Sequence, residues 1–380
     1  MVFLRDRGRL CAPHRWILIL LAILLIPALY LLFQSRWAVQ HPVSAAENSR
    51  ERAGSDATNR TENGLPLSHY NRNNLTVNLV VASLQQDDIS WTQNIQIPNL
   101  NIIRYVSDSM EAEYHPPVPR KGREALIYHT YMYDFYDKLP DITIFIHSDE
   151  SPWHVEGTLN SSMTFALSHL DLEQVLQRRY FNLRVSWDGA CPNWINTTKS
   201  AAEGNGQKKE EPYMREAFSE NFHTNDVPVI LAGPCCSQFA VTRDAVRRHP
   251  RSQYRITMDW LVQTGWTDYI TGRVWEHMWP WLFKGEAVDC AVEWKAYCRM
   301  YHICFDADSR SRITSLEEEK KELEKSYGLL DELIDLFGSS KITKRVEEIN
   351  AIMTAELENA LERGKSEAVR MELLSDLYTS

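Results

Sequence analysis

The stretch that decides the fold covers residues 139–154 and reads Leu139-Pro140-Asp141-Ile142-Thr143-Ile144-Phe145-Ile146-His147-Ser148-Asp149-Glu150-Ser151-Pro152-Trp153-His154. Its apolar, β-branched run predicts a buried strand over residues 141–146, and the strand ends in a cluster of imidazoles, carboxylates and an indole. Ligands of open α/β sheets bind in the crevice beyond the carboxyl ends of the strands. The stretch therefore predicts a strand that ends at a functional site. The alternative is a strand that runs into a solvated loop.

Strand and helix patterns alternate on both sides of this stretch. Strands are predicted at residues 77–84, 102–106, 182–187, 227–231 and 238–241. Helices are predicted at residues 123–137, 171–179, 242–248, 258–266 and 273–283, and Thr242 is the predicted cap of the third. The alternation predicts an α/β fold over residues 77–305, with a mixed, largely parallel sheet flanked by helices. Residues 199–211 are poor in apolar side chains and are predicted to form a surface insertion.

Composition and charge narrow the class of protein. The chain of 380 residues contains 12 Trp, which favours a well-packed globular part. Its net charge is −10, and residues 306–380 contain 18 acidic against 11 basic side chains, so most of the negative charge belongs to this C-terminal part. Because no basic stripe is interleaved with aromatic residues, we expect no nucleic-acid partner.

An apolar segment near the N-terminus predicts a membrane anchor. Residues 16–33, WILILLAILLIPALYLLF, are uncharged and long enough for a helix to cross roughly 30 Å of hydrocarbon. Four arginines precede this segment, which predicts a cytosolic tail over residues 1–15 and a single-pass type II membrane protein. Residues 34–76 are polar and predict a flexible stem that holds a lumenal domain away from the ER or Golgi membrane. A cleaved signal peptide is the alternative, but no clear small-x-small cleavage site follows the segment.

Glycosylation sequons and cysteines agree with a lumenal location. Acceptor sequons begin at Asn59, Asn74, Asn160 and Asn196. The cysteines beyond the anchor form an even set of disulfide candidates: Cys191, Cys235, Cys236, Cys290, Cys298 and Cys304. Because Cys235 and Cys236 are adjacent, we expect each to pair with a distant partner. A zinc site that uses Cys298, His302 and Cys304 is the alternative for the last cluster.

Residues 306–380 have a helical pattern of their own. Leu316, Leu323, Leu330 and Phe337 repeat at intervals of seven, and the pattern resumes after residues 338–340. We expect two helices with a short break. They could form a coiled coil that self-associates or binds a protein partner, or they could pack back onto the domain.

Ordered sequence blocks connect the chain with a known family. The blocks are Asp88-Ile89-Ser90-Trp91, Gly122-Arg123-Glu124 followed by Tyr128 and His129, Leu139-Pro140-Asp141, His147, Trp153-His154, Cys235-Cys236 through Arg243, and Gly272-Arg273 through Trp279. In this order they resemble the blocks of the DUF3431 family over about residues 77–305. Strand order and motif placement are in turn similar to the GT-A fold of glycosyltransferases, which is a fold-level analogy.

The GT-A resemblance implies a nucleotide-sugar donor and a glycan or glycolipid acceptor, with Mn²⁺ or Mg²⁺ held by His147 and Asp149 after the central strand. This departs from the Asp-x-Asp pair that such enzymes generally use. The implied substrate or nucleotide contacts are Asp88, Trp91, Arg123, Glu124, Trp153, His154, Gln238, Arg243 and Arg273. The alternative is that His147 and His154 only make hydrogen bonds within a loop.

Glu276 is the candidate catalytic base. It belongs to an aromatic helix, where burial would raise the carboxyl pKa toward neutrality. Asp259 and Asp268 are the reserve candidates. The alternative for Glu276 is an ion pair with Arg273 one helical turn away.

Three classes of function therefore compete. The first is a membrane-anchored, glycosyltransferase-like enzyme of the secretory pathway. The second is a non-catalytic GT-A-like protein that binds carbohydrate or assists assembly, with the helical extension as its partner surface. The third is a metal-dependent hydrolase that uses His147, Asp149 and His154, although no ligand motif such as His-Glu-x-x-His is present.

Overall fold

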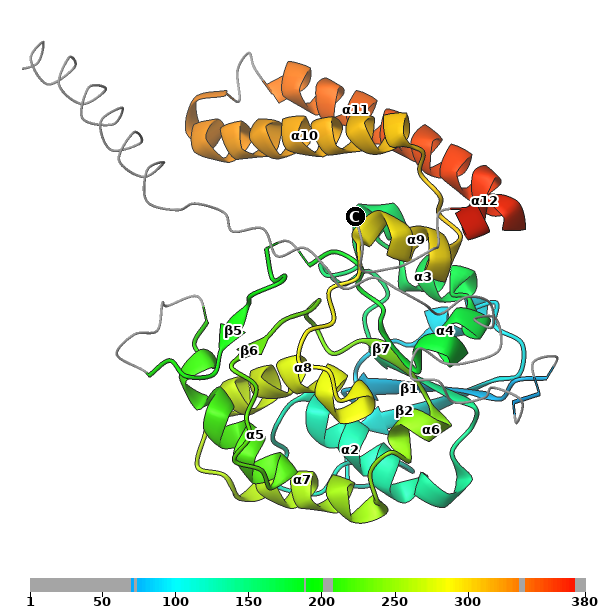
Figure 1. Cartoon of the computed structure of the whole chain (residues 1–380). Coiled ribbons are helices and arrows are strands. Elements are labelled where there is room, and N and C mark those ends of the chain that lie inside the picture. The colour runs from blue at the N-terminus through cyan, green and yellow to red at the C-terminus, as the bar shows by residue number, and fades with distance from the viewer. Residues whose placement is uncertain (1–69, 72–73, 188, 201–207, 335–338, 373–380) are drawn as a thin grey trace, which may run out of the picture. The chain divides into compact units, whose positions relative to one another are not determined.

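The strand expected at residues 141–146 is the middle strand of a five-stranded sheet (Figure 1). The computed structural model describes residues 70–71, 74–187, 189–200, 208–334 and 339–372. The strand order is β2-β1-β3-β7-β4. The strands are β1 (Val77–Ser83), β2 (Leu100–Val106), β3 (Ile142–His147), β4 (Tyr180–Asn182) and β7 (Phe239–Thr242). β1 pairs in parallel with β2 and β3, whereas β7 is antiparallel to both β3 and β4. The predicted mixed α/β architecture is confirmed.

The two faces of the sheet carry separate hydrophobic cores. Along β1, Val80 packs into one core, while Leu79 and Val81 pack into the other. On β3, Phe145 packs into the same core as Val80, and Ile144 packs into the same core as Leu79. Successive side chains of a strand point to opposite faces, so a run without polar residues is buried on both sides. Each fully buried aliphatic or aromatic side chain contributes about 1.5–3 kcal/mol to folding.

Helices cover both faces of the sheet (Figure 1). One core includes side chains of α2 (Glu124–Asp134), α5 (Met214–Phe222), α6 (Arg243–Val246), α7 (Arg251–Gln263) and α8 (Asp268–Lys284). The other core includes side chains of α3 (Met163–His169), α4 (Leu172–Arg178) and α9 (Glu293–Tyr301). A short antiparallel pair, β5 (Ile195–Asn196) with β6 (Ile230–Leu231), stands apart from the main sheet.

Local signals explain where several elements begin and end. Thr242 caps α6 as predicted, because its side chain accepts a hydrogen bond from the Ala245 amide. The strand predicted at residues 182–187 is wrong beyond Asn182. The carboxylate of Glu156 accepts hydrogen bonds from the Val185 and Ser186 amides, so this backbone is satisfied without a neighbouring strand. The helix predicted at residues 258–266 is shifted toward the N-terminus and covers Arg251–Gln263, directly after Pro250.

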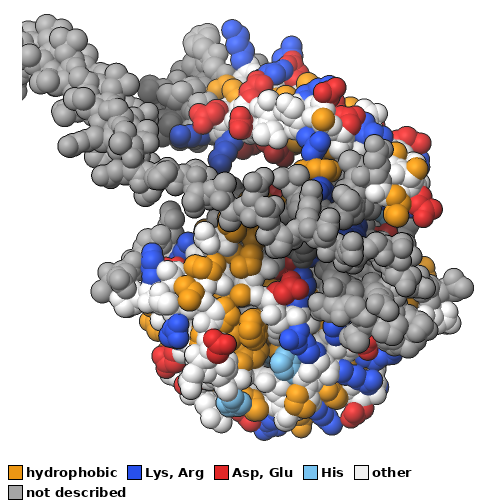
Figure 2. Space-filling view, viewed as in Figure 1, with side chains coloured by type: hydrophobic (Ala, Val, Ile, Leu, Met, Phe, Trp, Pro, Cys, Tyr) orange, Lys and Arg blue, Asp and Glu red, His pale blue; other side chains and the backbone are white. Residues whose placement is uncertain are grey.

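The C-terminal extension forms two long helices and a short one, α10 (Ala307–Ile334), α11 (Ser339–Gly364) and α12 (Glu367–Glu372). α10 and α11 lie side by side, and charged side chains of both signs lie on their visible surface (Figures 1 and 2). Ile313, Leu357, Ala360 and Leu361 pack against the core that includes α3, α4 and α9. The extension therefore packs back onto the domain, one of the two expected arrangements; self-association stays a prediction.

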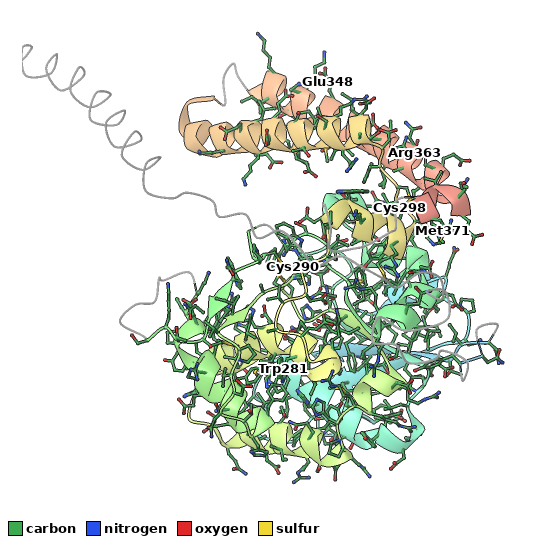
Figure 3. The ribbon with its side chains drawn as sticks, viewed as in Figure 1. Trp281, Cys290, Cys298, Glu348, Arg363 and Met371 are labelled. Carbon is green, nitrogen blue, oxygen red and sulfur yellow. A yellow bond between two sulfur atoms is a disulfide. The ribbon has the colours of Figure 1, made fainter. Side chains whose placement is uncertain are left out.

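The disulfides correct one expectation from the sequence. Cys191 bonds to Cys290 and Cys298 bonds to Cys304, and Figure 3 labels Cys290 before α9 and Cys298 within it. The prediction that Cys235 and Cys236 find distant partners is wrong, since their sulfur atoms are bonded to each other. The positive φ of 89° at Cys236 turns the chain sharply at this point.

The zinc alternative for the last cysteine cluster is not supported by these contacts. The Cys298 and Cys304 sulfur atoms are bonded to each other. The His302 ring instead lies 2.8 Å from an Asp171 carboxylate oxygen.

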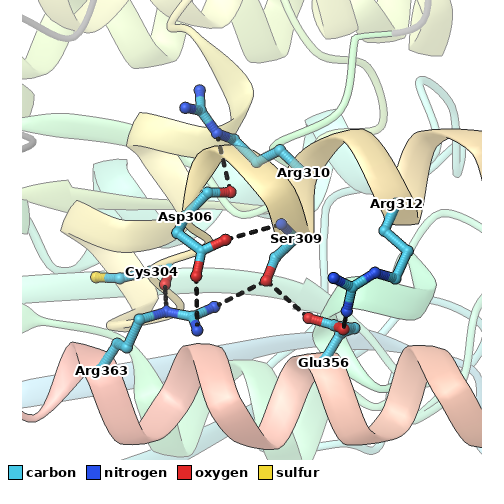
Figure 4. A network of polar contacts seen from close by, with 7 residues as sticks. All are labelled: Cys304, Asp306, Ser309, Arg310, Arg312, Glu356 and Arg363. Atoms are coloured by element: carbon cyan, nitrogen blue, oxygen red, sulfur yellow. Dashed lines mark hydrogen bonds and ion pairs between the residues drawn. The ribbon is translucent and has the colours of Figure 1, made fainter.

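A polar network joins α11 to the start of α10 and, through the Cys304 carbonyl, to the end of the domain (Figure 4). The Arg363 side chain donates to the Cys304 carbonyl at 2.8 Å and to the Ser309 hydroxyl at 3.2 Å, and it lies 3.0 Å from the Asp306 carboxylate. Ser309 donates in turn to Glu356 at 2.7 Å. The adjacent Gly364 lies directly against the His302 backbone, where an added Cβ would overlap the carbonyl oxygen.

Several predictions concern residues outside the described part of the chain. They are the cytosolic tail, the membrane anchor at residues 16–33, the stem through residue 69 and the sequon at Asn59. Within the described residues, no helix combines the length and apolarity needed to cross a bilayer. Asn74 and Asn160 are exposed and Asn196 is half-buried, and glycosylation at these positions stays a prediction.

Candidate functional site

A cavity of about 450 Å³, the strand-end crevice, lies beyond the carboxyl ends of β1 and β3. The chain passes from β1 to β2 on one side and then returns through α2 to β3 on the other side, so the strand order reverses here. Such a switch point is where open α/β sheets bind their ligands. The lining residues are Ala82, Ser83, Leu84, Asp87, Ser107, Arg120, Arg123, Glu124, Ile127, His147 and Asp268.

The N-terminus of α2 brings cationic groups to the crevice. Gly122 and Arg123 both have positive φ, of 74° and 51°, and this turn starts the helix at Glu124. The Arg123 amide donates to the Asp268 carboxylate at 3.1 Å. The Arg123 side chain lies across Gly272, where a Cβ would be only 2.9 Å from its Cδ. The tertiary fold therefore brings the sequence block at Gly122-Arg123 into contact with the block at Gly272-Arg273.

Asp87, rather than the predicted Asp88, belongs to the crevice. Its carboxylate accepts hydrogen bonds from the Leu84 amide at 2.8 Å and the Ser148 hydroxyl at 2.6 Å, which joins the loops after β1 and β3. Asp88 is exposed and accepts a bond from the Ser90 amide. The Trp91 indole donates to the Ser148 carbonyl at 2.9 Å and so has a positioning role here. Because Asp87 and Asp88 are adjacent and of the same type, the sequence does not indicate which of them faces the crevice.

His147 and His154 are neighbours at the end of β3. Their ring centroids are 5.1 Å apart in an edge-to-face arrangement, and the Nε2 atoms of both rings are buried without a hydrogen-bond partner. Burial, together with the Arg123 charge, lowers the pKa of His147 to about 4. Burial, followed by the charges of His147 and Arg184, lowers the pKa of His154 to about 4. Both rings are therefore neutral at neutral pH, a form that can bind a metal ion.

Gln238 and Asp149 both interact with this pair of histidines. The buried Gln238 accepts a hydrogen bond from the His147 amide at 3.0 Å, so it positions the end of β3 instead of facing a ligand. Asp149 is exposed and accepts a bond from the Ser151 amide at 3.1 Å, while its charge acts on both imidazoles.

Two carboxyl groups have raised pKa values: Glu124, which lines the crevice, and Glu276, which lines a second hollow. Burial raises the pKa of Glu124, although a hydrogen bond with Ser237 opposes this effect. Burial, followed by the charge of Glu124, raises the pKa of Glu276 to about 7. This is the direction that the sequence predicted for Glu276. A carboxyl group with this pKa can accept and release a proton near neutral pH.

The family described as a protein of unknown function, DUF3431, matches residues 79–299. The chain belongs to the DUF3431 family. No curated protein and no solved structure matches the chain. The DUF3431 match includes the strand-end crevice and both carboxyl groups, whereas helices α10–α12 lie beyond it.

Glu210 is a residue of the DUF3431 region that sequence reasoning missed. It is fully buried, lies 3.0 Å from the Arg273 guanidinium and 3.2 Å from the His277 ring, and therefore takes the ion pair considered for Glu276. Burial opposes its ionisation, but hydrogen bonds with His277 and Arg273 lower the pKa of Glu210 to about 2. Residues 199–211 were expected to be a surface insertion. Because Glu210 belongs to a stretch that is poor in apolar side chains, no local signal indicates its burial.

Arg243 and Asp259 are among the predicted residues that lie away from the crevice. Arg243 follows β7 at the opposite end of the sheet, where it pairs with Asp141 at 3.2 Å, just before β3 begins. Asp259 is in an exposed pair with Arg255 on α7 at 2.9 Å. Both have structural partners, whereas the other reserve base, Asp268, lines the crevice.

Proposed function

We propose that this DUF3431 protein is a glycosyltransferase-like enzyme that binds a nucleotide sugar in the strand-end crevice and transfers the sugar to a glycan or glycolipid acceptor. The observation that carries this proposal is the position of the crevice at the switch point between β1 and β3, next to the first turn of α2. Amide groups of a helix N-terminus, together with Arg120 and Arg123, suit the phosphates of such a donor.

The sheet topology supports the GT-A analogy. Three parallel strands, β2, β1 and β3, are followed by the antiparallel β7. The candidate ligands His147 and Asp149 come at or just after the end of the middle strand, where the analogy expects them.

The residues at this point fit a divalent cation that is shared with the donor. Mg²⁺ is commonly bound by one or two protein side chains plus substrate phosphates. The unpartnered, neutral His147 ring and the exposed Asp149 carboxylate are available for this role. In the described part of the chain, no group of three or more His, Cys, Asp and Glu side chains could hold an ion, so the diphosphate would complete the coordination. A bound cation would stabilise the charge on the leaving diphosphate.

Glu276 is the proposed base for the transfer. Its carboxylate takes the proton of the acceptor hydroxyl while the hydroxyl oxygen bonds to the anomeric carbon of the donor. The bond between that carbon and the diphosphate oxygen breaks, and the electron pair leaves with the diphosphate. A pKa of about 7 leaves about half of Glu276 ionised at neutral pH, and each transfer returns the proton to solvent.

Ligand-dependent stability tests the proposal. The purified full-length chain is heated with Mn²⁺ and, in turn, with UDP, GDP, ADP and CDP. A ligand at about 100 times its Kd stabilises the folded state by about 2.7 kcal/mol, so one diphosphate is expected to raise the Tm. Arg123→Ala should remove the rise, while Arg255→Ala, which breaks the exposed pair with Asp259, should retain it.

The same experiment separates the competing functions. The absence of any nucleotide response would contradict the transferase proposal. A nucleotide response without transfer to any acceptor would favour the non-catalytic alternative. An unchanged Mn²⁺ response in Asp149→Asn would remove Asp149 from the proposed ligands.

The proposed location is the ER or Golgi membrane, with the domain on the lumenal side. Its support is the apolar segment at residues 16–33 together with the exposed sequon asparagines, Asn74 and Asn160. Digestion of the expressed chain with an N-glycosidase should increase its gel mobility. No change in mobility would count against lumenal exposure.

A further inference from the structure

A second hollow, the tryptophan hollow, lies beside Glu276. Its volume is about 220 Å³. Among its lining residues are Trp153, Trp187, Trp194, Arg184, Ser186 and Glu276. Three indoles thus surround a carboxyl group that the proposed transfer uses as its base. Pockets for drug-sized ligands measure about 300–1,000 Å³, so this volume suits one small ring better than an extended ligand.

Trp153 is the most unusual member of this set. Its exposed fraction is 80%, the largest of the exposed large hydrophobic side chains in the described residues. The Arg184 guanidinium lies over its ring at 5.4 Å from the centroid and donates to the Cys235 sulfur at 3.0 Å, so the indole has a fixed cation on one side. Figure 2 shows hydrophobic side chains gathered on the face that carries β6 and α8. An indole held open to solvent offers a flat apolar surface at little entropic cost.

The tryptophan hollow is connected to the strand-end crevice by one series of ring contacts. The rings of Trp153 and His154 are 5.3 Å apart, and His154 in turn contacts His147 of the crevice. The two sites also interact through charge, since Glu276 lines the hollow and the charge of Glu124, which lines the crevice, acts on it. A molecule in the hollow would therefore contact Glu276, and Trp153 would link it to the end of β3 through the two imidazole rings.

We propose that the tryptophan hollow binds a single sugar ring of the acceptor and presents its hydroxyl group to Glu276. The apolar face of a sugar ring packs on an indole, while its hydroxyl groups need hydrogen-bond partners such as Arg184, Ser186 and the Glu276 carboxylate. This assignment rests on the proposed transfer reaction, because it uses Glu276 as the shared group. It names the acceptor as a carbohydrate rather than a protein side chain or a lipid.

Saturation-transfer difference NMR on the full-length chain tests the hollow directly. The probes are methyl α-mannoside, methyl β-glucoside, methyl β-galactoside and N-acetylglucosamine. At least one probe should receive saturation from the protein, and Trp153→Ala should weaken its binding about tenfold, since one indole face is lost. Trp294→Ala is the matched control, because this tryptophan of α9 packs under Arg310 and does not line the hollow.

Each outcome of this test is decisive. No saturation of any probe, or equal saturation in the wild type and Trp153→Ala, would overturn the assignment. The nucleotide-dependent Tm of the same protein is measured in parallel. Sugar binding that depends on Trp153, without any nucleotide-dependent rise in Tm, would support the sugar site and contradict the transferase proposal. A nucleotide-dependent rise in Tm without sugar binding would overturn the sugar site alone.

Discussion

The imidazole rings of His147 and His154 meet edge to face, with 5.1 Å between their centroids, and both have buried Nε2 atoms without hydrogen-bond partners. His147 ends the central strand and His154 precedes the loop that turns toward α3. The pair therefore couples the end of the sheet to the loop that carries the exposed Trp153. It also makes stability depend on pH, because neither ring is easily charged where it lies.

Acid should destabilise the protein through these histidines. Their pKa is about 4 in the folded state, against an ordinary value of 6.5, so between these values the unfolded state binds more protons. The two histidines therefore do not lower the free energy of unfolding above pH 6.5, and they lower it progressively as the pH drops toward 4. Replacing His154 by Phe, which keeps a ring, should reduce the loss of Tm between pH 7 and pH 5 in EDTA. An unchanged loss would show that His154 does not contribute.

Glu276 should have the opposite effect on pH dependence. Its pKa is about 7 in the folded state against 4.5 ordinarily, so its stabilising contribution is complete below pH 4.5 and is lost as the pH rises through 7. The shift corresponds to about 3 kcal/mol. Relative to the wild type, Glu276→Gln should therefore have a higher Tm at pH 8 than it has at pH 5. The same substitution should abolish transfer. Glu216→Gln, which removes an exposed carboxyl group of α5, is the control and should have neither effect.

Removal of the Asp289 carboxylate should be costly. Asp289 lies 3.0 Å from Arg178 and 3.1 Å from Lys284, and all three side chains are buried. Breaking a buried pair leaves uncompensated charge and costs about 3–5 kcal/mol. Asp289→Asn should lower the free energy of unfolding by about that amount in a urea titration. Asp259→Asn, in an exposed pair with Arg255, should cost less than about 1 kcal/mol; equal losses would contradict the buried cluster.

Gly364→Ala should release the helical extension from the domain. A Cβ at this position would overlap the His302 carbonyl, and overpacking of this kind costs about 1–3 kcal/mol. Hydrogen exchange followed by mass spectrometry should detect faster exchange in α11 and α12, while β1 and β3 keep their protection. Gly265→Ala is the matched control, since nothing lies within 4 Å of the added Cβ. Normal protection of α11 in Gly364→Ala would show that this contact does not hold the extension.

The sequence by itself determined the elements whose signals are local. The apolar run before His147 specifies a strand buried on both faces, Thr242 specifies the start of α6, and the heptad spacing specifies two helices after residue 306. The direction of the Glu276 pKa shift could also be predicted, because a helix rich in aromatic residues favours desolvation of its carboxyl group. These properties depend on side chains only a few residues apart.

Only the tertiary structure decided which groups meet. It turned Asp87 rather than Asp88 into the crevice, placed Arg243 at the far end of the sheet, and paired Arg273 with Glu210, a residue 63 positions away. These outcomes depend on strand order and on charge pairing across the core, where a buried carboxylate must find a distant cation to offset its lost hydration. The periodicity of the sequence does not indicate which distant residues will pair. The crevice and the tryptophan hollow therefore could not be predicted before the strand order was known.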